Sequence, residues 1–169
     1  MITSQPLILS DEVLATGLEP LTWDVQPLIS RGDRVVVFGE FGSFKSWILL
    51  HLAWHLSTGA KWLGLFDVPE PRRVLYLDEE MNARTLRRRV KRIASGLTTK
   101  TDGASLAFLS RAGVRFDAYG AGTLLTYLER QKFTPQVVIV EALRRVVIGD
   151  ENEARDMAQF WRNLEPVSR

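Results

Sequence analysis

Hydrophobic residues along the chain form short β-branched runs that alternate with longer segments of helical character. Three continuous runs predict strands buried on both faces, as in a parallel sheet, at residues 34–38, 73–78 and 137–140. A weaker strand is predicted at residues 106–109. Helices are predicted in the apolar or capped segments, at residues 45–57, 82–95, 117–131 and 151–164. This alternation predicts an α/β fold with a mainly parallel sheet flanked by helices.

The N-terminal part of the chain has a different character. Residues 1–30 contain three prolines and scattered leucines without a clear period. We therefore expect an N-terminal arm over residues 1–30, with one short helix after Ser10, and a single domain over residues 31–169. A chain of 169 residues suits one such domain. Hydrophobic residues make up 46% and charged residues 25%, which excludes a disordered chain.

The amino-acid composition limits the possible catalytic groups, binding partners and cellular location of the protein. The chain has no cysteine, which excludes a disulfide scaffold and a cysteine nucleophile and favours a cytoplasmic location. The longest apolar stretch, residues 47–56, contains two histidines. It is much shorter than the roughly 20 apolar residues that cross a bilayer, so no membrane partner is expected. Lys and Arg number 22 against 20 Asp and Glu, so bulk charge does not indicate a nucleic-acid binder, although a local patch still can.

A glycine-bearing turn between the first predicted strand and the next helix is the most informative segment. The phosphate-loop pattern G-x-x-x-x-G-K-[ST] is met at Gly39, Lys45 and Ser46, while Phe44 takes the place of the second glycine. Lys45 would contact the β- and γ-phosphates of a nucleotide, and the Ser46 hydroxyl would bind Mg²⁺. The alternative is a turn that merely contains glycine and lysine. The residues expected to line the nucleotide are Gly39, Glu40, Phe41, Gly42, Ser43, Phe44, Lys45, Ser46 and Trp47.

Acidic residues follow two of the predicted strands. Asp78, Glu79 and Glu80 lie directly at the carboxyl end of the second strand, where ligands bind in open parallel sheets. A carboxylate there can orient the water that attacks a γ-phosphate, or it can cap the next helix. Glu141 ends the run 137–140 in the form of a Walker B element, whose acid holds Mg²⁺ through water. The alternative for Glu141 is an ordinary strand end.

The sequence Gly-Glu-Phe-Gly-Ser-Phe-Lys-Ser, followed by an apolar helix, resembles the RecA-like ATPases of the RepA and DnaB helicase group. The resemblance covers residues 20–169 and implies a RecA-like P-loop core. Some members of that group carry the Gly-Ser-Phe-Lys-Ser loop, which makes Phe44 a family variant. The group's catalytic Glu directly before Met corresponds to Glu80, with Glu79 as the alternative. Asp is the commoner residue at the position of Glu141.

The resemblance implies an ATPase that uses ATP and Mg²⁺. Lys45 and Glu80 would act in catalysis, and Ser46 and Glu141 would hold the metal. It further implies a homo-oligomeric ring or filament, completed by an arginine from a neighbour, that works as a helicase on single-stranded DNA in plasmid, phage or mobile-element replication. A rival reading is a nucleotide-binding regulatory or assembly module with little hydrolysis, which Phe44 and Glu141 favour. A small-molecule kinase is disfavoured because no lid segment is evident.

Basic residues gather in two places. Six of the nine residues from Arg84 to Arg92 are Arg or Lys, which is typical of a solvated helix face and also suits contact with a phosphate backbone. Arg144 and Arg145, after the third strong strand, are candidates for contact with DNA or a neighbouring subunit.

The resemblance also implies a strand between residues 137–140 and the phosphate-loop strand. The sequence ends at Arg169, directly after the helix that would lead into it. Unpaired buried backbone groups cost about 1–3 kcal/mol each. We therefore expect a slot between residues 35–38 and 137–140, filled by a continuation past Arg169, by another segment or by another subunit.

Overall fold

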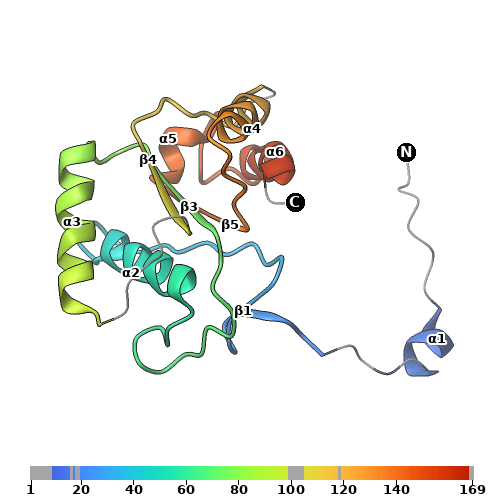
Figure 1. Ribbon diagram of the computed structural model, residues 1–169. Coiled ribbons are helices and arrows are strands. Elements are labelled where there is room, and N and C mark those ends of the chain that lie inside the picture. Colours follow the sequence, from blue (N-terminus) through green and yellow to red (C-terminus); the bar gives the residue numbers. More distant parts are fainter. Residues whose placement is uncertain (1–8, 16, 18–19, 99–104, 118, 168–169) are drawn as a thin grey trace.

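A parallel sheet forms the centre of the molecule. The computed structural model describes residues 9–15, 17, 20–98, 105–117 and 119–167. The central sheet has three strands in the order β4-β3-β5, formed by β3 (Val74–Asp78), β4 (Leu106–Ser110) and β5 (Val137–Glu141). Helices cover both faces of this sheet (Figure 1). The predicted α/β fold with a parallel sheet flanked by helices is confirmed.

The three strands pair without an offset, so their carboxyl ends meet at one edge. Asp78, the last residue of β3, lies opposite Ser110 of β4 and Glu141 of β5. All five side chains of the central strand β3 are buried, as a sheet covered on both faces requires. The carboxyl edge is where open parallel sheets bind their ligands.

One face of the sheet is covered by α2 (Lys45–Thr58) and α3 (Ala83–Gly96). Their shared core joins apolar residues of α2 to alternate residues of the strands, and includes Leu50, Ala53, Leu56, Val74, Tyr76 and Ile139. Gly59 ends α2 with a φ of 70°, and its N–H donates to the carbonyl of His55 at 2.9 Å. Asn82 begins α3, because its Oδ1 accepts the N–H of Thr85 at 2.9 Å.

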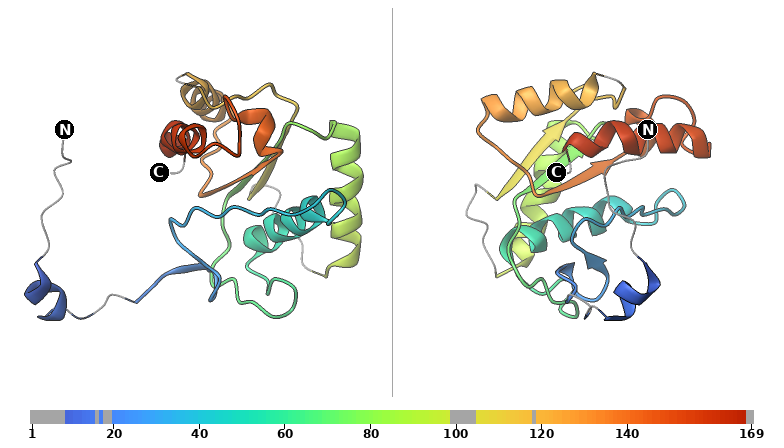
Figure 2. Two further views of the ribbon diagram at one scale, coloured as in Figure 1. Left: turned by 180° about the vertical axis from the view of Figure 1, so that it is seen from behind. Right: turned by 90° about the vertical axis from the view of Figure 1, so that its right-hand side faces the viewer.

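The opposite face is covered by α4 (Gly120–Arg130) and α6 (Ala154–Leu164), which lie side by side in both views of Figure 2. Phe116 and Phe160 meet edge to face with ring centroids 5.5 Å apart, at the centre of this second core. The predicted helices 117–131 and 151–164 are therefore present. The sequence did not predict α5 (Leu143–Val146) or the 3₁₀ turn Glu165–Val167, which are too short to show a period. No helix within the described ranges is long and apolar enough to cross a bilayer.

The N-terminal part contains α1 (Ser10–Ala15) and a small antiparallel pair, β1 (Trp23–Val25) with β2 (Ile29–Ser30). Val25 is completely buried in the core beneath α2, and Asp24 pairs with Arg72 at 3.0 Å. Residues 23–30 thus pack against the domain although they belong to the predicted arm. The division at residue 30 stays a prediction.

The prediction of a buried strand over residues 34–38 is wrong. These residues belong to no strand, and Val35, Val36 and Val37 are each about half exposed, while Phe38 is 90% exposed. The β-branched run favours an extended backbone, but a strand also needs a hydrogen-bonded neighbour. In the described part of the chain β5 pairs only with β3, and no strand pairs with residues 34–38.

Residues 34–38 begin with a contact to the rest of the domain. The guanidinium of Arg34 lies over the ring of Trp161 in α6, 5.7 Å from its centroid. The structure agrees with the expectation that residues 35–38 do not pair directly with β5. The strand expected between them stays a prediction.

Candidate functional site

The turn before α2 adopts the tight form expected of a phosphate loop. Gly42 has a φ of 82° and Phe44 a φ of 59°, so the chain twice enters the left-handed region within three residues. The hydroxyl of Ser43 donates to the carbonyl of Glu40 at 2.7 Å and closes the turn. The helix α2 begins at Lys45, and the N–H of Trp47 donates to the carbonyl of Phe44 at 3.0 Å. The N–H groups of Lys45 and Ser46 precede the first hydrogen bond of the helix, so they can bind an anion.

Phe44 takes the backbone conformation that suits the glycine of the phosphate-loop pattern. Its φ of 59° and ψ of 18° are left-handed, and its side chain is 71% exposed. The ring therefore leaves the loop open on the concave side, and the cost is local backbone strain of about 1–2 kcal/mol for a residue with a Cβ atom. Phenylalanine at this position therefore costs backbone energy that glycine would not.

Lys45 closes over its own loop. Its ammonium donates to the carbonyls of Gly39 at 2.6 Å and Glu40 at 2.7 Å, and lies 3.3 Å from the hydroxyl of Ser43. The cation is therefore already at the concave side of the loop. An incoming phosphate would replace these neutral carbonyl acceptors with anionic oxygens.

Ser46 and Glu141 are 95 residues apart in sequence and in direct contact. The hydroxyl of Ser46 donates to Oε1 of Glu141, and the hydroxyl of Tyr76 donates to Oε2 of the same carboxylate. The two predicted metal ligands are thus brought together. Burial raises the pKa of Glu141, although the two hydroxyl donors oppose that shift.

Asp78 is a buried carboxylate at this edge and one of the three acids that the sequence placed at the end of the second predicted strand. Its Oδ1 accepts the N–H groups of Glu80 and Met81, both at 2.8 Å. Its Oδ2 is buried and accepts no hydrogen bond from any described residue. Burial raises the pKa of Asp78, and the nearby charge of Glu80 adds to the shift. The alignment of parallel strand ends is the sequence signal that could have singled out Asp78 as the neighbour of Glu141.

The oxygen ligands at this edge fit a Mg²⁺ ion. Mg²⁺ is usually held by one or two carboxylates together with substrate phosphates. Ser46 and Glu141 supply a hydroxyl and a carboxylate, and Asp78 adds a buried oxygen without a hydrogen bond from the described residues. The described part of the chain holds no group of three His, Cys, Asp or Glu side chains that would bind a metal on its own. Ser46 and Glu141 would therefore hold the ion only together with a nucleotide.

Glu79 and Glu80 have different environments. The carboxylate of Glu79 accepts three backbone N–H groups from the loop after β4, those of Ala112, Gly113 and Val114, at 3.0–3.1 Å. Glu80 is exposed, and its backbone carbonyl accepts the Nε–H of Arg111 at 2.8 Å. Glu79 is thus a structural anchor for that loop, whereas the side chain of Glu80 faces solvent at the carboxyl edge. This difference favours Glu80 as the residue that orients water.

One residue of the basic helix lies beside the site. Arg89 is half-buried, and its guanidinium lies over the ring of Trp47, 5.3 Å from the centroid. Burial raises the pKa values of Asp78 and Glu141, and the charge of Arg89 opposes both shifts. The other basic residues of α3 are exposed, as a solvated helix face predicts: Arg84, Arg87, Arg88, Lys91 and Arg92.

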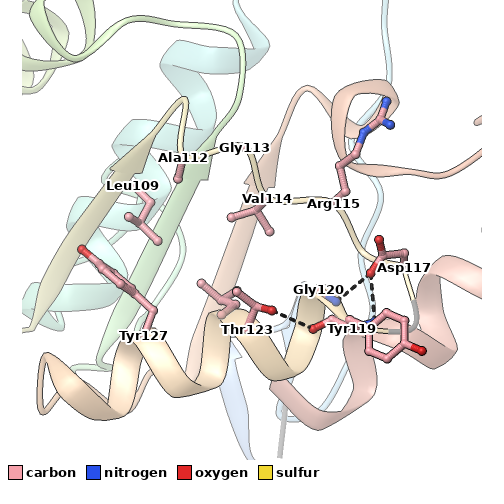
Figure 3. Close-up of a pocket in the computed structure, with 11 residues that line it drawn as sticks. Leu109, Ala112, Gly113, Val114, Arg115, Asp117, Tyr119, Gly120, Thr123 and Tyr127 are labelled. Carbon is pink, nitrogen blue, oxygen red and sulfur yellow. Dashed lines mark hydrogen bonds between the residues drawn. The ribbon is translucent and has the colours of Figure 1, made fainter.

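A separate pocket of about 510 Å³ lies on the face of the sheet opposite to α2 (Figure 3). Its floor is apolar, with Leu109 and Leu124, and the exposed Tyr119 lies at its rim. The carboxylate of Asp117 accepts the N–H groups of Tyr119 at 2.9 Å and Gly120 at 2.8 Å, at the start of α4. The sheet separates this pocket from the phosphate loop.

A parallel sheet whose carboxyl edge meets a lysine-bearing loop is consistent with a P-loop nucleoside triphosphatase core. A family model described as AAA domain matches residues 3–169, and the chain belongs to this family. The family relationship supports ATP binding and ATPase activity in general. No protein of curated function matches the chain significantly.

The left-handed backbone of Phe44 yields a prediction about stability. Phe44→Gly should raise the free energy of unfolding by about 1 kcal/mol, because glycine adopts this conformation without strain and little burial is lost. The measurement is urea denaturation followed by circular dichroism. Phe41→Gly is the matched control, since Phe41 is fully exposed but has no positive φ. It should lower stability or leave it unchanged, and an equal loss in both variants would contradict the assignment.

Proposed function

We propose that this domain binds ATP together with Mg²⁺ at the carboxyl edge of the sheet and hydrolyses it. The hydrogen bond between Ser46 and Glu141 carries the proposal, because it joins the start of α2 to the end of β5 where a metal is needed. In this proposal Lys45 contacts the phosphates and Ser46 and Glu141 hold the metal. Residues 39–44 and Trp47 surround the triphosphate, and Glu80 orients the attacking water.

The chemistry that these residues supply is mainly positioning and charge stabilisation. Phosphoryl transfer passes through a loose transition state whose charge lies on the phosphoryl oxygens, so little covalent work falls to the protein. Mg²⁺ held by Ser46 and Glu141 would supply positive charge against the charge that develops on the phosphates. Lys45 would add a second cation from the loop, and the exposed carboxylate of Glu80 would accept a hydrogen bond from water.

We further propose that the domain works as a homo-oligomer, in a ring or filament, on single-stranded DNA. The resemblance to the RepA and DnaB helicase group supports this proposal. Arg144 and Arg145 also support it, because both are exposed on α5 just beyond the carboxyl end of β5. Either arginine can serve a neighbour's nucleotide or a DNA phosphate.

A regulatory or assembly module with little hydrolysis is the second candidate. The observation that favours it is the closed state of Lys45, whose ammonium is held by its own loop.

Lys45→Ala tests nucleotide binding. The variant should weaken the affinity for ATP by about 1.5–3 kcal/mol, which is the range for hydrogen bonds to a charged group. Titration with a fluorescent ATP analogue measures the change. Lys61→Ala is a matched control, since Lys61 pairs with Asp67 on the surface at 2.9 Å and should not affect binding. Unchanged affinity in Lys45→Ala would remove the phosphate-loop assignment.

Glu80→Gln tests the water-orienting role. The variant should bind ATP as before and reduce the rate of phosphate release on the order of 100-fold or more, because the glutamine amide is a poor proton acceptor. Glu79→Gln should instead lower the free energy of unfolding, since its carboxylate holds three backbone N–H groups. A loss of turnover in Glu79→Gln alone, with stability intact, would transfer the role to Glu79.

Phosphate release with and without single-stranded DNA separates the two candidate functions. A DNA-dependent motor should release phosphate several-fold faster when DNA is added, and Arg144→Ala with Arg145→Ala should abolish that increase. Tight ATP binding without turnover in either condition would support the regulatory module. Mass measured in solution with and without ATP and Mg²⁺ tests the oligomer in the same samples.

A further inference from the structure

Both oxygens of the Glu141 carboxylate are engaged by hydroxyl groups. Ser46 donates to Oε1 from the first turn of α2, and Tyr76 donates to Oε2 from β3. A glutamate side chain has three rotatable bonds, so a single contact would leave its carboxylate free to turn. Two donors on opposite oxygens fix its direction.

Packing holds the side chain of Tyr76 in one position. Tyr76 is completely buried, and its ring packs against that of Phe108 with centroids 5.9 Å apart. Tyr76 lies opposite Ile139 in the register of β3 and β5, two positions before the pair Asp78 and Glu141. The tyrosine therefore reaches diagonally along one face of the sheet toward the end of β5.

We propose that Tyr76 is a positioning residue that fixes the carboxylate of Glu141 so that its other oxygen is directed at Ser46. This inference rests on the proposed function, in which Ser46 and Glu141 hold Mg²⁺. Tyr76 does not touch the nucleotide and acts only through Glu141. Because the tyrosine hydroxyl is buried, a carboxylate too short to reach it would leave a buried donor without a partner, at a cost comparable to a lost hydrogen bond. The hydroxyl of Tyr76 therefore requires a side chain as long as glutamate at position 141.

The protonation of Tyr76 agrees with this role. Burial raises the pKa of its phenol far above the ordinary value, and the charge of Glu141 raises it further. The hydroxyl thus remains a donor throughout the neutral range. The proposed role requires no proton transfer from the Tyr76 hydroxyl.

Tyr76→Phe removes the hydroxyl and keeps the buried ring. We expect this variant of the full chain to fold and to bind a fluorescent ATP analogue normally in EDTA. The Mg²⁺ concentration that gives half of the metal-dependent increase in ATP affinity should rise about 10-fold. Tyr127→Phe is the matched control, because Tyr127 lies on α4, which covers the opposite face of the sheet. The Mg²⁺ requirement of this control variant should equal that of the wild type.

A double-mutant cycle separates positioning from packing. In a Glu141→Asp background the shorter side chain cannot reach Tyr76, so adding Tyr76→Phe should change the Mg²⁺ requirement less than 2-fold. An equal effect of Tyr76→Phe in both backgrounds would overturn the proposal, as would an unchanged Mg²⁺ requirement in the single variant. If the wild-type chain binds no ATP with Mg²⁺, the proposed function fails, and the role of Tyr76 falls with it. Normal ATP binding by the wild type with no effect of Tyr76→Phe would overturn the positioning role alone.

Discussion

Unshifted pairing of the parallel strands is the constraint on which the rest of the structure depends. Because β3 and β5 end at the same level, Asp78 and Glu141 are placed side by side at the carboxyl edge. The same pairing puts Tyr76 within reach of Glu141. A shift of one residue would turn Glu141 to the opposite face, toward α4 and α6, and separate it from Ser46. The sheet register is thus a condition for the site as well as for the core.

Local patterns in the sequence predicted most of the elements, and they failed where a partner was needed. Asn82 and Gly59 fix helix ends by their own chemistry, so α3 and α2 have nearly the predicted bounds. Residues 34–38 have the composition of a strand, but a strand is a pairing of two segments, and composition cannot supply the second one. The place of these residues depends instead on contacts such as that of Arg34 with Trp161.

The candidate site shows the same difference between residues that a local pattern predicts and residues whose role depends on distant segments. The phosphate-loop spacing predicted Lys45 and Ser46, and the end of β5 predicted Glu141, because both signals are contiguous in sequence. The distinct environments of Glu79 and Glu80 could not be predicted, since Glu79 is fixed by backbone groups more than 30 residues away. Tyr76 was not singled out, and Asp78 was named only as one of three acids, because a strand pattern shows that a side chain is buried but not which polar group it meets.

Exposure of residues 34–38 bears on how the protein behaves at high concentration. Their β-branched and aromatic side chains face water, and their backbone N–H and C=O groups form no ladder with any described strand. Such a segment is a template for edge-to-edge pairing between molecules, which soluble proteins ordinarily block with charges or prolines. Residues 35–38 contain neither a charge nor a proline. The short segment that leads into the phosphate loop is therefore the place where we expect association between molecules to begin at high concentration, and a partner that covered it would also act against aggregation.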